Sequence, residues 1–220
     1  MINIGGGQSG KIQEVETNTL AGRAAIKPND VGALGAYSLG AVSGVMAAGL
    51  AANAPIFSFR YGGANLVLLK RVLLTAINAG TAFTAGVCNF SMFAARSFTA
   101  SDSGGTSVLP TLNKLRTSQG TTGVSDIRLS STGALTAGTR TLDGQPLAAL
   151  TGVASVTAST VIIPPATPLF DRSAPGAWPD VIANNEGFVI QATVAATGTW
   201  TFAVQVDWEE VSTYGTGLAV

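Results

Sequence analysis

The 220-residue chain contains no histidine and a single cysteine, Cys88. Without histidine there is no Ser-His-Asp or Cys-His catalysis, and the commonest metal ligand is missing. One cysteine excludes an intramolecular disulfide and a multi-cysteine zinc site. Cys88 lies in an apolar run, which predicts that it packs as a small hydrophobic residue. No Gly-x-Ser-x-Gly nucleophile motif occurs either. We therefore expect a protein that is not an enzyme and has no cofactor.

Charge is also scarce. Charged residues make up 11% of the chain and hydrophobic residues 46%, and 12 basic residues balance 12 acidic ones. An average soluble domain carries about 25% charged residues. There is no basic excess for binding nucleic acid. Near-zero net charge favours association, so much of the surface is predicted to be buried against copies of the chain or other proteins. The alternative is a monomer covered in Ser and Thr.

Neither a signal peptide nor a membrane span is predicted. Residues Met1–Gly10 lack a basic start followed by an apolar core. No charge occurs from Val31 to Phe59, a length that could cross a bilayer. Serine, asparagine and repeated glycine interrupt the stretch Val31–Ala54, and large apolar residues are sparse in it. Small residues of this kind favour an extended arm or close-packed strands.

The first thirty residues differ from the rest. Residues 1–30 contain a Gly-Gly-Gly run and little apolar surface, which predicts an extended N-terminal arm that orders on a neighbouring subunit. Gly5, Gly10 and Lys11 satisfy the spacing of a phosphate-binding loop, but Ile12 stands where Ser or Thr must bind magnesium. A flexible arm is the better interpretation. Residues 31–220 are predicted to form one domain.

Short apolar runs separated by Gly and Pro predict strands through that domain. The expected strands are Ile56–Tyr61, Asn65–Ile77, Phe83–Ala95, Ile127–Leu129, Gly138–Leu142 and Val156–Ile163, the last ended by Pro164-Pro165. Residues Gln145–Leu150 suggest one helical turn, and Thr111–Asp126 and Thr167–Asp180 suggest loops.

The clearest pattern is at the C-terminus. Phe188–Val194 alternates apolar and polar residues, and Asn184–Gly187 before it is a turn signal. A connection of hairpin length follows, Ala195–Gly198. One face of the next strand is then entirely large and apolar: Trp200, Phe202, Val204, Val206 and Trp208. This period of two predicts a C-terminal hairpin with one buried face.

Many short strands and almost no helix predict an all-β fold, an antiparallel β-sandwich or barrel. A jelly roll suits the length and the long loops. Strand order cannot be read from the pattern.

Carboxylates are the remaining candidates for chemistry. Asp207 and Glu209 share the wet face of the last strand and Glu210 points the other way, which is more typical of a solvated edge than of a glycosidase pair. Asp171 and Asp180 lie in a Pro-rich loop and could bind calcium, although no EF-hand spacing is present. Trp178 could stack on a sugar, but we expect it to cap the core. No catalytic, cofactor or metal residue is assigned.

Five segments carry a family resemblance: Pro55–Arg60, Phe93–Gly105, Leu135–Leu142, Asn184–Ile190 and Gly198–Trp200. Together they resemble a family of small virion-associated proteins encoded by tailed bacteriophages, mostly without assigned function. The resemblance covers roughly residues 45–212. It implies a phage particle and supplies no functional residues.

The leading expectation is a head decoration or cement protein, a homotrimer bound to the major capsid protein on the outer capsid surface. Its partners would be itself and the capsid, with no nucleic acid or membrane. The alternative is a tail, baseplate or fibre component that binds the host surface through loops at 101–126 and 164–180. A β-fold glycosidase is the third possibility.

Overall fold

The computed structural model describes residues 4–5, 12–13, 34–109, 114–115, 118–157, 159–174 and 177–214. Internal contacts divide the chain into two units, Met1–Asp30 and Val31–Val220. In the first unit, β1 (Ile4–Gly5) pairs antiparallel with β2 (Ile12–Gln13). The rest of the predicted arm, including most of the segment that resembles a phosphate loop, lies outside the described residues.

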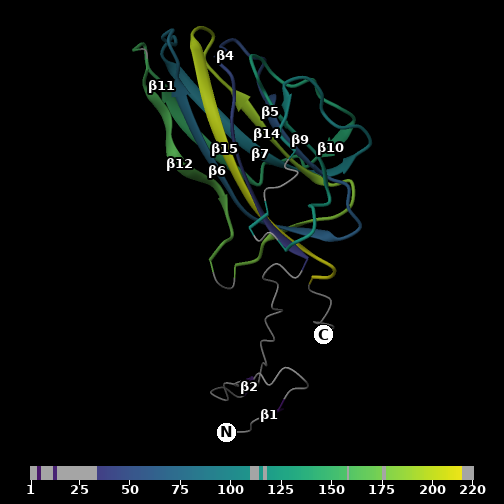
Figure 1. Ribbon diagram of the computed structural model, residues 1–220. Coiled ribbons are helices and arrows are strands. Elements are labelled where there is room, and N and C mark those ends of the chain that lie inside the picture. Colours follow the sequence, from purple (N-terminus) through teal and green to yellow (C-terminus); the bar gives the residue numbers. More distant parts are fainter. Residues whose placement is uncertain are drawn as a thin grey trace. The chain divides into compact units, whose positions relative to one another are not determined.

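The second unit is an antiparallel β-sandwich, as predicted (Figure 1). Its described residues contain no helix and form two sheets that pack face to face. The β6 sheet has the order β12 (Val161–Asp171), β6 (Leu66–Asn78), β15 (Thr199–Val211), β3 (Gly35–Val42), with β13 (Asp180–Ile182) on β6 and β4 (Met46–Ala47) on β15. The β7 sheet has the order β10 (Arg140–Leu142), β7 (Gly86–Phe98), β14 (Gly187–Thr193), β5 (Ala54–Tyr61), β9 (Val124–Leu129), β8 (Thr106–Ser107), with β11 (Ala148–Ala154) also on β7.

The core lies between the sheets and is rich in aromatic rings. All five large apolar residues of β15 are buried, so the predicted face of that strand is confirmed. Trp208 of β15 meets Phe59 of the other sheet edge to face, with ring centroids 5.4 Å apart, and Trp200 meets Phe90 at 5.8 Å. Cys88 is buried in the same cluster, as predicted. These ring pairs join the two sheets.

The predicted C-terminal hairpin is wrong. β14 lies between β5 and β7, whereas β15 lies between β6 and β3 in the other sheet. The connection Ala195–Gly198 therefore crosses from one sheet to the other. Gly198 has φ 106°, and a Cβ there would lie 2.8 Å from the Ala82 carbonyl oxygen. The turn at Asn184–Gly187 is confirmed, with Asn185 at φ 61°.

The prolines near residue 165 do not end a strand, contrary to the prediction. β12 starts at Val161 and continues through Pro164, Pro165 and Pro168 to Asp171, with its register shifting along β6. This is possible because β12 is an edge strand, where a residue without an N–H removes no ladder bond on the outer side. The expected loop at Thr167–Asp180 is wrong at both ends. Its first residues belong to β12, which runs to Asp171, and Asp180 begins β13.

Two other expectations near the β7 sheet need correction. The helical turn at Gln145–Leu150 is wrong: Ala148–Leu150 begins β11 and pairs with Met92–Phe90. The expected loop Thr111–Asp126 ends in β9, which begins at Val124. The Val31–Ala54 stretch contains β3 and β4, in agreement with the prediction of close-packed strands. The jelly roll itself stays a prediction.

Candidate interaction surface

The outer face of the β6 sheet carries uncharged rows of side chains. Because alternate residues of β15 fill the core, Thr201, Ala203 and Gln205 point outward, and their cross-strand partners point the same way. The pairings give three rows: Val161–Ile77–Thr201, Thr75–Ala203–Val42 and Pro168–Leu73–Gln205–Gly40. We call these three rows the apolar face.

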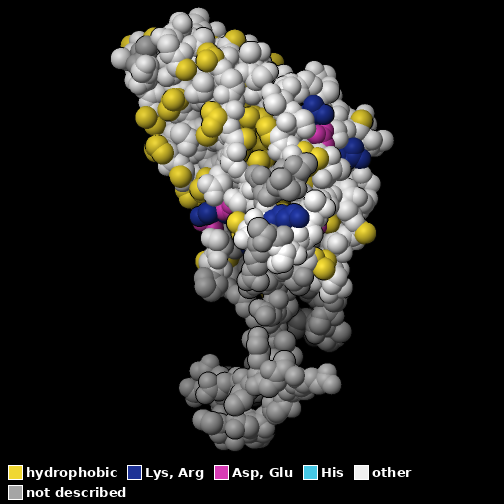
Figure 2. All heavy atoms as spheres, viewed as in Figure 1, with side chains coloured by type: hydrophobic (Ala, Val, Ile, Leu, Met, Phe, Trp, Pro, Cys, Tyr) yellow, Lys and Arg dark blue, Asp and Glu magenta, His cyan; other side chains and the backbone are white. Residues whose placement is uncertain are grey.

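Large apolar side chains on this face are open to solvent. Val42 is 70% exposed, Val161 54% and Ile77 40%. Figure 2 shows hydrophobic side chains spread over the upper part of the surface that carries β12, β6 and β15 in this view. Scattered apolar residues are normal on a protein surface, but adjoining rows without a charge are typical of a contact site.

A shallow hollow lies within the apolar face. It has a volume of about 210 Å³, and its lining includes Gly40, Leu73, Thr75, Ala166 and Ala203. The hollow exists because Gly40 and Ala203 have almost no side chain there. A Cβ added at Gly40 would meet no atom within 4 Å.

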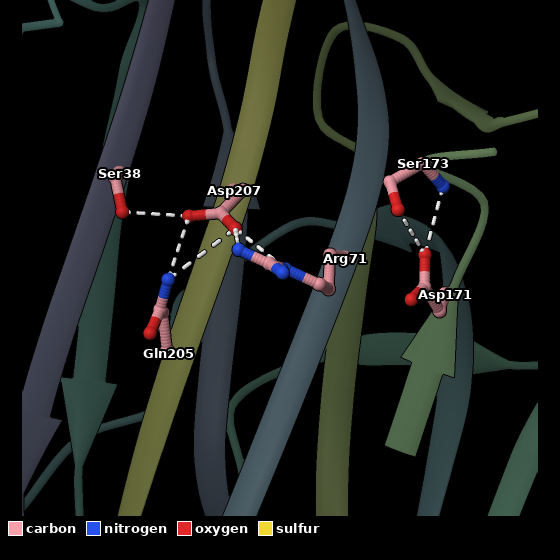
Figure 3. Close-up of polar contacts among 6 residues, drawn as sticks. All are labelled: Ser38, Arg71, Asp171, Ser173, Gln205 and Asp207. Atoms are coloured by element: carbon pink, nitrogen blue, oxygen red, sulfur yellow. Dashed lines mark hydrogen bonds and ion pairs between the residues drawn. The ribbon is translucent and has the colours of Figure 1, made fainter. Parts of the chain in front are cut away.

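The next row along the sheet, Asp171–Arg71–Asp207–Ser38, is polar, and within it Arg71 pairs with Asp207 (Figure 3). The Asp207 carboxylate accepts hydrogen bonds from Ser38 Oγ at 2.6 Å, Arg71 Nε at 2.8 Å and Gln205 Nε2 at 3.2 Å. Lys70 Nζ lies 3.2 Å from Glu209 Oε2. Asp207 and Glu209 therefore share the outer face, as predicted, and each has a cationic partner.

Glu210 is buried at the opposite side of β15, so the prediction of a solvated edge is wrong for this residue. Its carboxylate accepts hydrogen bonds from Thr122 Oγ1 at 2.5 Å and Gly123 N at 2.9 Å, and from the Tyr61 hydroxyl at 3.4 Å. Burial first, and then the Glu210 charge, raise the pKa of Tyr61. The cluster ties the Thr122–Gly123 segment to the end of the sandwich. Its members are far apart in the chain, so no local signal marked them.

The two aspartates considered for calcium have different surroundings. Asp171 Oδ1 accepts hydrogen bonds from Ser173 N at 2.8 Å and Ser173 Oγ at 2.6 Å, and these bonds lower its pKa (Figure 3). Burial is the main reason that the pKa of Asp180 is raised. Within the described residues, no three His, Cys, Asp or Glu side chains come together as a metal site would require.

Trp178 does not cap the core, contrary to the prediction. It is 68% exposed, and its ring meets that of Tyr214 edge to face with centroids 6.2 Å apart.

A buried ion pair that sequence reasoning missed joins Asp102, in the segment after β7, to Arg140 at the start of β10. Asp102 Oδ1 also accepts a hydrogen bond from Gly138 N at 2.8 Å. The two side chains are 0% and 6% exposed, and burial lowers the pKa of Arg140.

No family model, no curated protein and no solved structure matches this chain. Among the described residues there is no helix of the length and hydropathy needed to span a bilayer.

Proposed function

We propose that this chain is a structural protein of a tailed-phage particle, most directly a head decoration or cement protein on the outer capsid surface. The observation that carries the proposal is the apolar face: three uncharged rows on the β6 sheet, next to a polar row in which Arg71 is already paired with Asp207. Such a face serves assembly and has no evident role in catalysis. In this proposal the protein has no enzymatic activity and acts through contacts with itself and the major capsid protein.

The strand pairing supports a jelly roll, an architecture found in viral capsid domains. The first long strand, β3, pairs with the last, β15, and β5 pairs with β14. Inside these pairs, β6 pairs with β12 and β7 with β11. Nested pairing of this kind is what a long antiparallel hairpin produces when it is rolled up, and we infer a jelly roll from it.

The physical action would be cementing. Each copy would bury apolar surface at repeated contacts, and each buried Å² contributes about 25 cal/mol. Small contributions repeated over a lattice would stiffen the shell against internal pressure. Residues 1–30 would lie across neighbouring subunits, as expected from their composition.

A tail, baseplate or fibre component that binds the host surface is the second candidate. The exposed ring of Trp178, beside Tyr214, favours it, because aromatic rings in accessible segments stack on sugars.

Copy number in purified particles tests the proposal. Quantitative mass spectrometry would compare this protein with the major capsid protein. A ratio near one, or a simple lattice fraction of it, supports the decoration function. A handful of copies per particle supports the tail component, and absence from the particle refutes both.

A further inference from the structure

We propose that the apolar face binds the same face of a second copy of this chain, about a two-fold axis. The inference rests on the proposed assembly function and names its partner. It differs from the homotrimer expected from the sequence. A surface that is complementary to itself pairs with one other copy about a two-fold axis, which gives a dimer.

Both edges of the β6 sheet are covered at points within the described part of the chain, which favours association through its outer face. On one side β11 approaches β12 so closely that a side chain at Gly152 would collide with the Ile162 carbonyl group. On the other side, Leu115 N donates to Ala36 O at 3.0 Å, and Ala47 N donates to Thr132 O at 3.0 Å. Covered edges are protected from strand-to-strand pairing with another molecule.

The shape of the apolar face is complementary to itself. Val42 is the most exposed of its large aliphatic side chains, and the hollow lined by Gly40, Ala203 and Thr75 lies beside Val42. A projection and a hollow side by side on one surface can each receive the other when two copies meet about a two-fold axis.

The charge of this region favours a like copy over a charged partner. No charged residue lies in the three rows. Of the neighbouring acidic residues, Asp207 and Glu209 are paired with Arg71 and Lys70, and Asp171 lies on the edge strand β12 across from Arg71. The three rows of two copies can therefore meet without repulsion between like charges. A strongly charged partner would find no complementary charge.

The outer face of the whole β6 sheet is close to the size that a stable dimer needs. Its four long strands have 11, 13, 13 and 8 residues, and with about 3.3 Å per residue and about 4.8 Å between strands they cover roughly 700 Å², of which the three rows take up roughly 300 Å². A standard stable interface buries about 800 Å² on each partner. Sheets that pack in this way lie about 10 Å apart.

Sedimentation velocity on the purified full chain over a concentration series tests the pairing. We expect a dimer, and Val42→Asp should raise its dissociation constant about tenfold or more, because a carboxylate would be buried in an apolar hollow. Val153→Asp is the matched control: Val153 is also 70% exposed on an edge strand, but in the β7 sheet, so the dimer should persist.

Gly40→Val separates association from folding. It fills the hollow without a clash, so the thermal transition should be kept or raised while dimerisation weakens about tenfold or more. This variant decides the question if Val42→Asp does not fold. A wild-type monomer at about 100 µM, a trimer, or a dimer unchanged by Gly40→Val would overturn the proposal.

The outcome is separable from that of the proposed function. A monomer in solution that is nevertheless abundant on particles refutes this pairing and leaves the decoration function in place. A dimer in solution that is absent from particles supports this pairing and refutes the decoration function.

Discussion

The buried pair of Asp102 and Arg140 supports a prediction with a defined size. Asp102→Asn removes the negative charge and leaves a guanidinium group that is 6% exposed without its anion. Removing one partner of a buried ion pair costs about 3–5 kcal/mol, because the other charge stays buried and uncompensated. Burial lowers the pKa of Arg140, because the buried guanidinium group loses its hydration. For a domain of this size the loss corresponds to a fall in Tm of roughly 10 °C.

Urea unfolding at neutral pH measures this loss, with the midpoint interpreted only where the slope is unchanged. The double variant Asp102→Asn with Arg140→Met removes both charges and should recover most of the stability, since an apolar replacement of a buried pair is often neutral or better. The coupling energy from the full double-mutant cycle should be at least about 2 kcal/mol. As a control, Asp143→Asn disrupts the solvent-exposed pair with Arg96 and should cost much less.

Equal losses for Asp102→Asn and Asp143→Asn would refute this reasoning. The reasoning would also be refuted if Asp102→Asn with Arg140→Met were no more stable than Asp102→Asn alone. The loss of stability would then come from lost packing around Gly138 and not from an unpaired charge.

Three further outcomes are expected. Trp200→Asp should abolish the cooperative thermal transition, since the ring is fully buried against Phe90. Trp200→Phe should retain the transition. An unchanged thermal transition for Trp200→Asp would contradict the assignment of Trp200 to the buried face of β15. Burial raises the pKa of Asp180 above its ordinary 3.8, so the ionised carboxylate destabilises the fold at neutral pH. This penalty vanishes as the pH falls below 3.8, where the group is protonated in both the folded and the unfolded chain. Asp180→Asn should therefore raise the urea midpoint at about pH 7 and not at about pH 3. Glu210→Ala should destabilise by about 2–3 kcal/mol in urea, more than Glu209→Ala, because it leaves the partly buried Gly123 N–H and the Thr122 hydroxyl without their acceptor.

Local patterns predicted most of the strands. Alternation of large and small or polar residues marked the buried face of β15 and the β5, β6 and β7 strands, because a strand places successive side chains on opposite faces whatever it pairs with. The same alternation predicted that Asp207 and Glu209 point outward and that Glu210 points to the opposite face. It did not predict that Glu210 is buried.

The errors share a cause, since each depended on neighbours that are distant in the chain. Ala195–Gly198 has the length of a hairpin loop, but β14 and β15 each have better partners in separate sheets. Pro164 and Pro165 would end a central strand, but β12 is at an edge. Trp178 is a large apolar residue that the fold leaves 68% exposed, with its ring against that of Tyr214.

The sequence by itself determined an all-β chain with little charge, no histidine and a C-terminal strand with one apolar face, because these depend only on composition and on a period of two. Tertiary structure alone decided which strands are neighbours. Cross-strand pairing placed Val42, Ala203 and Thr75 in one row, and so made an uncharged face from residues of four separate strands. It also brought Arg140 to Asp102 and Thr122 to Glu210, since a buried charge is tolerated only where the fold supplies its partner.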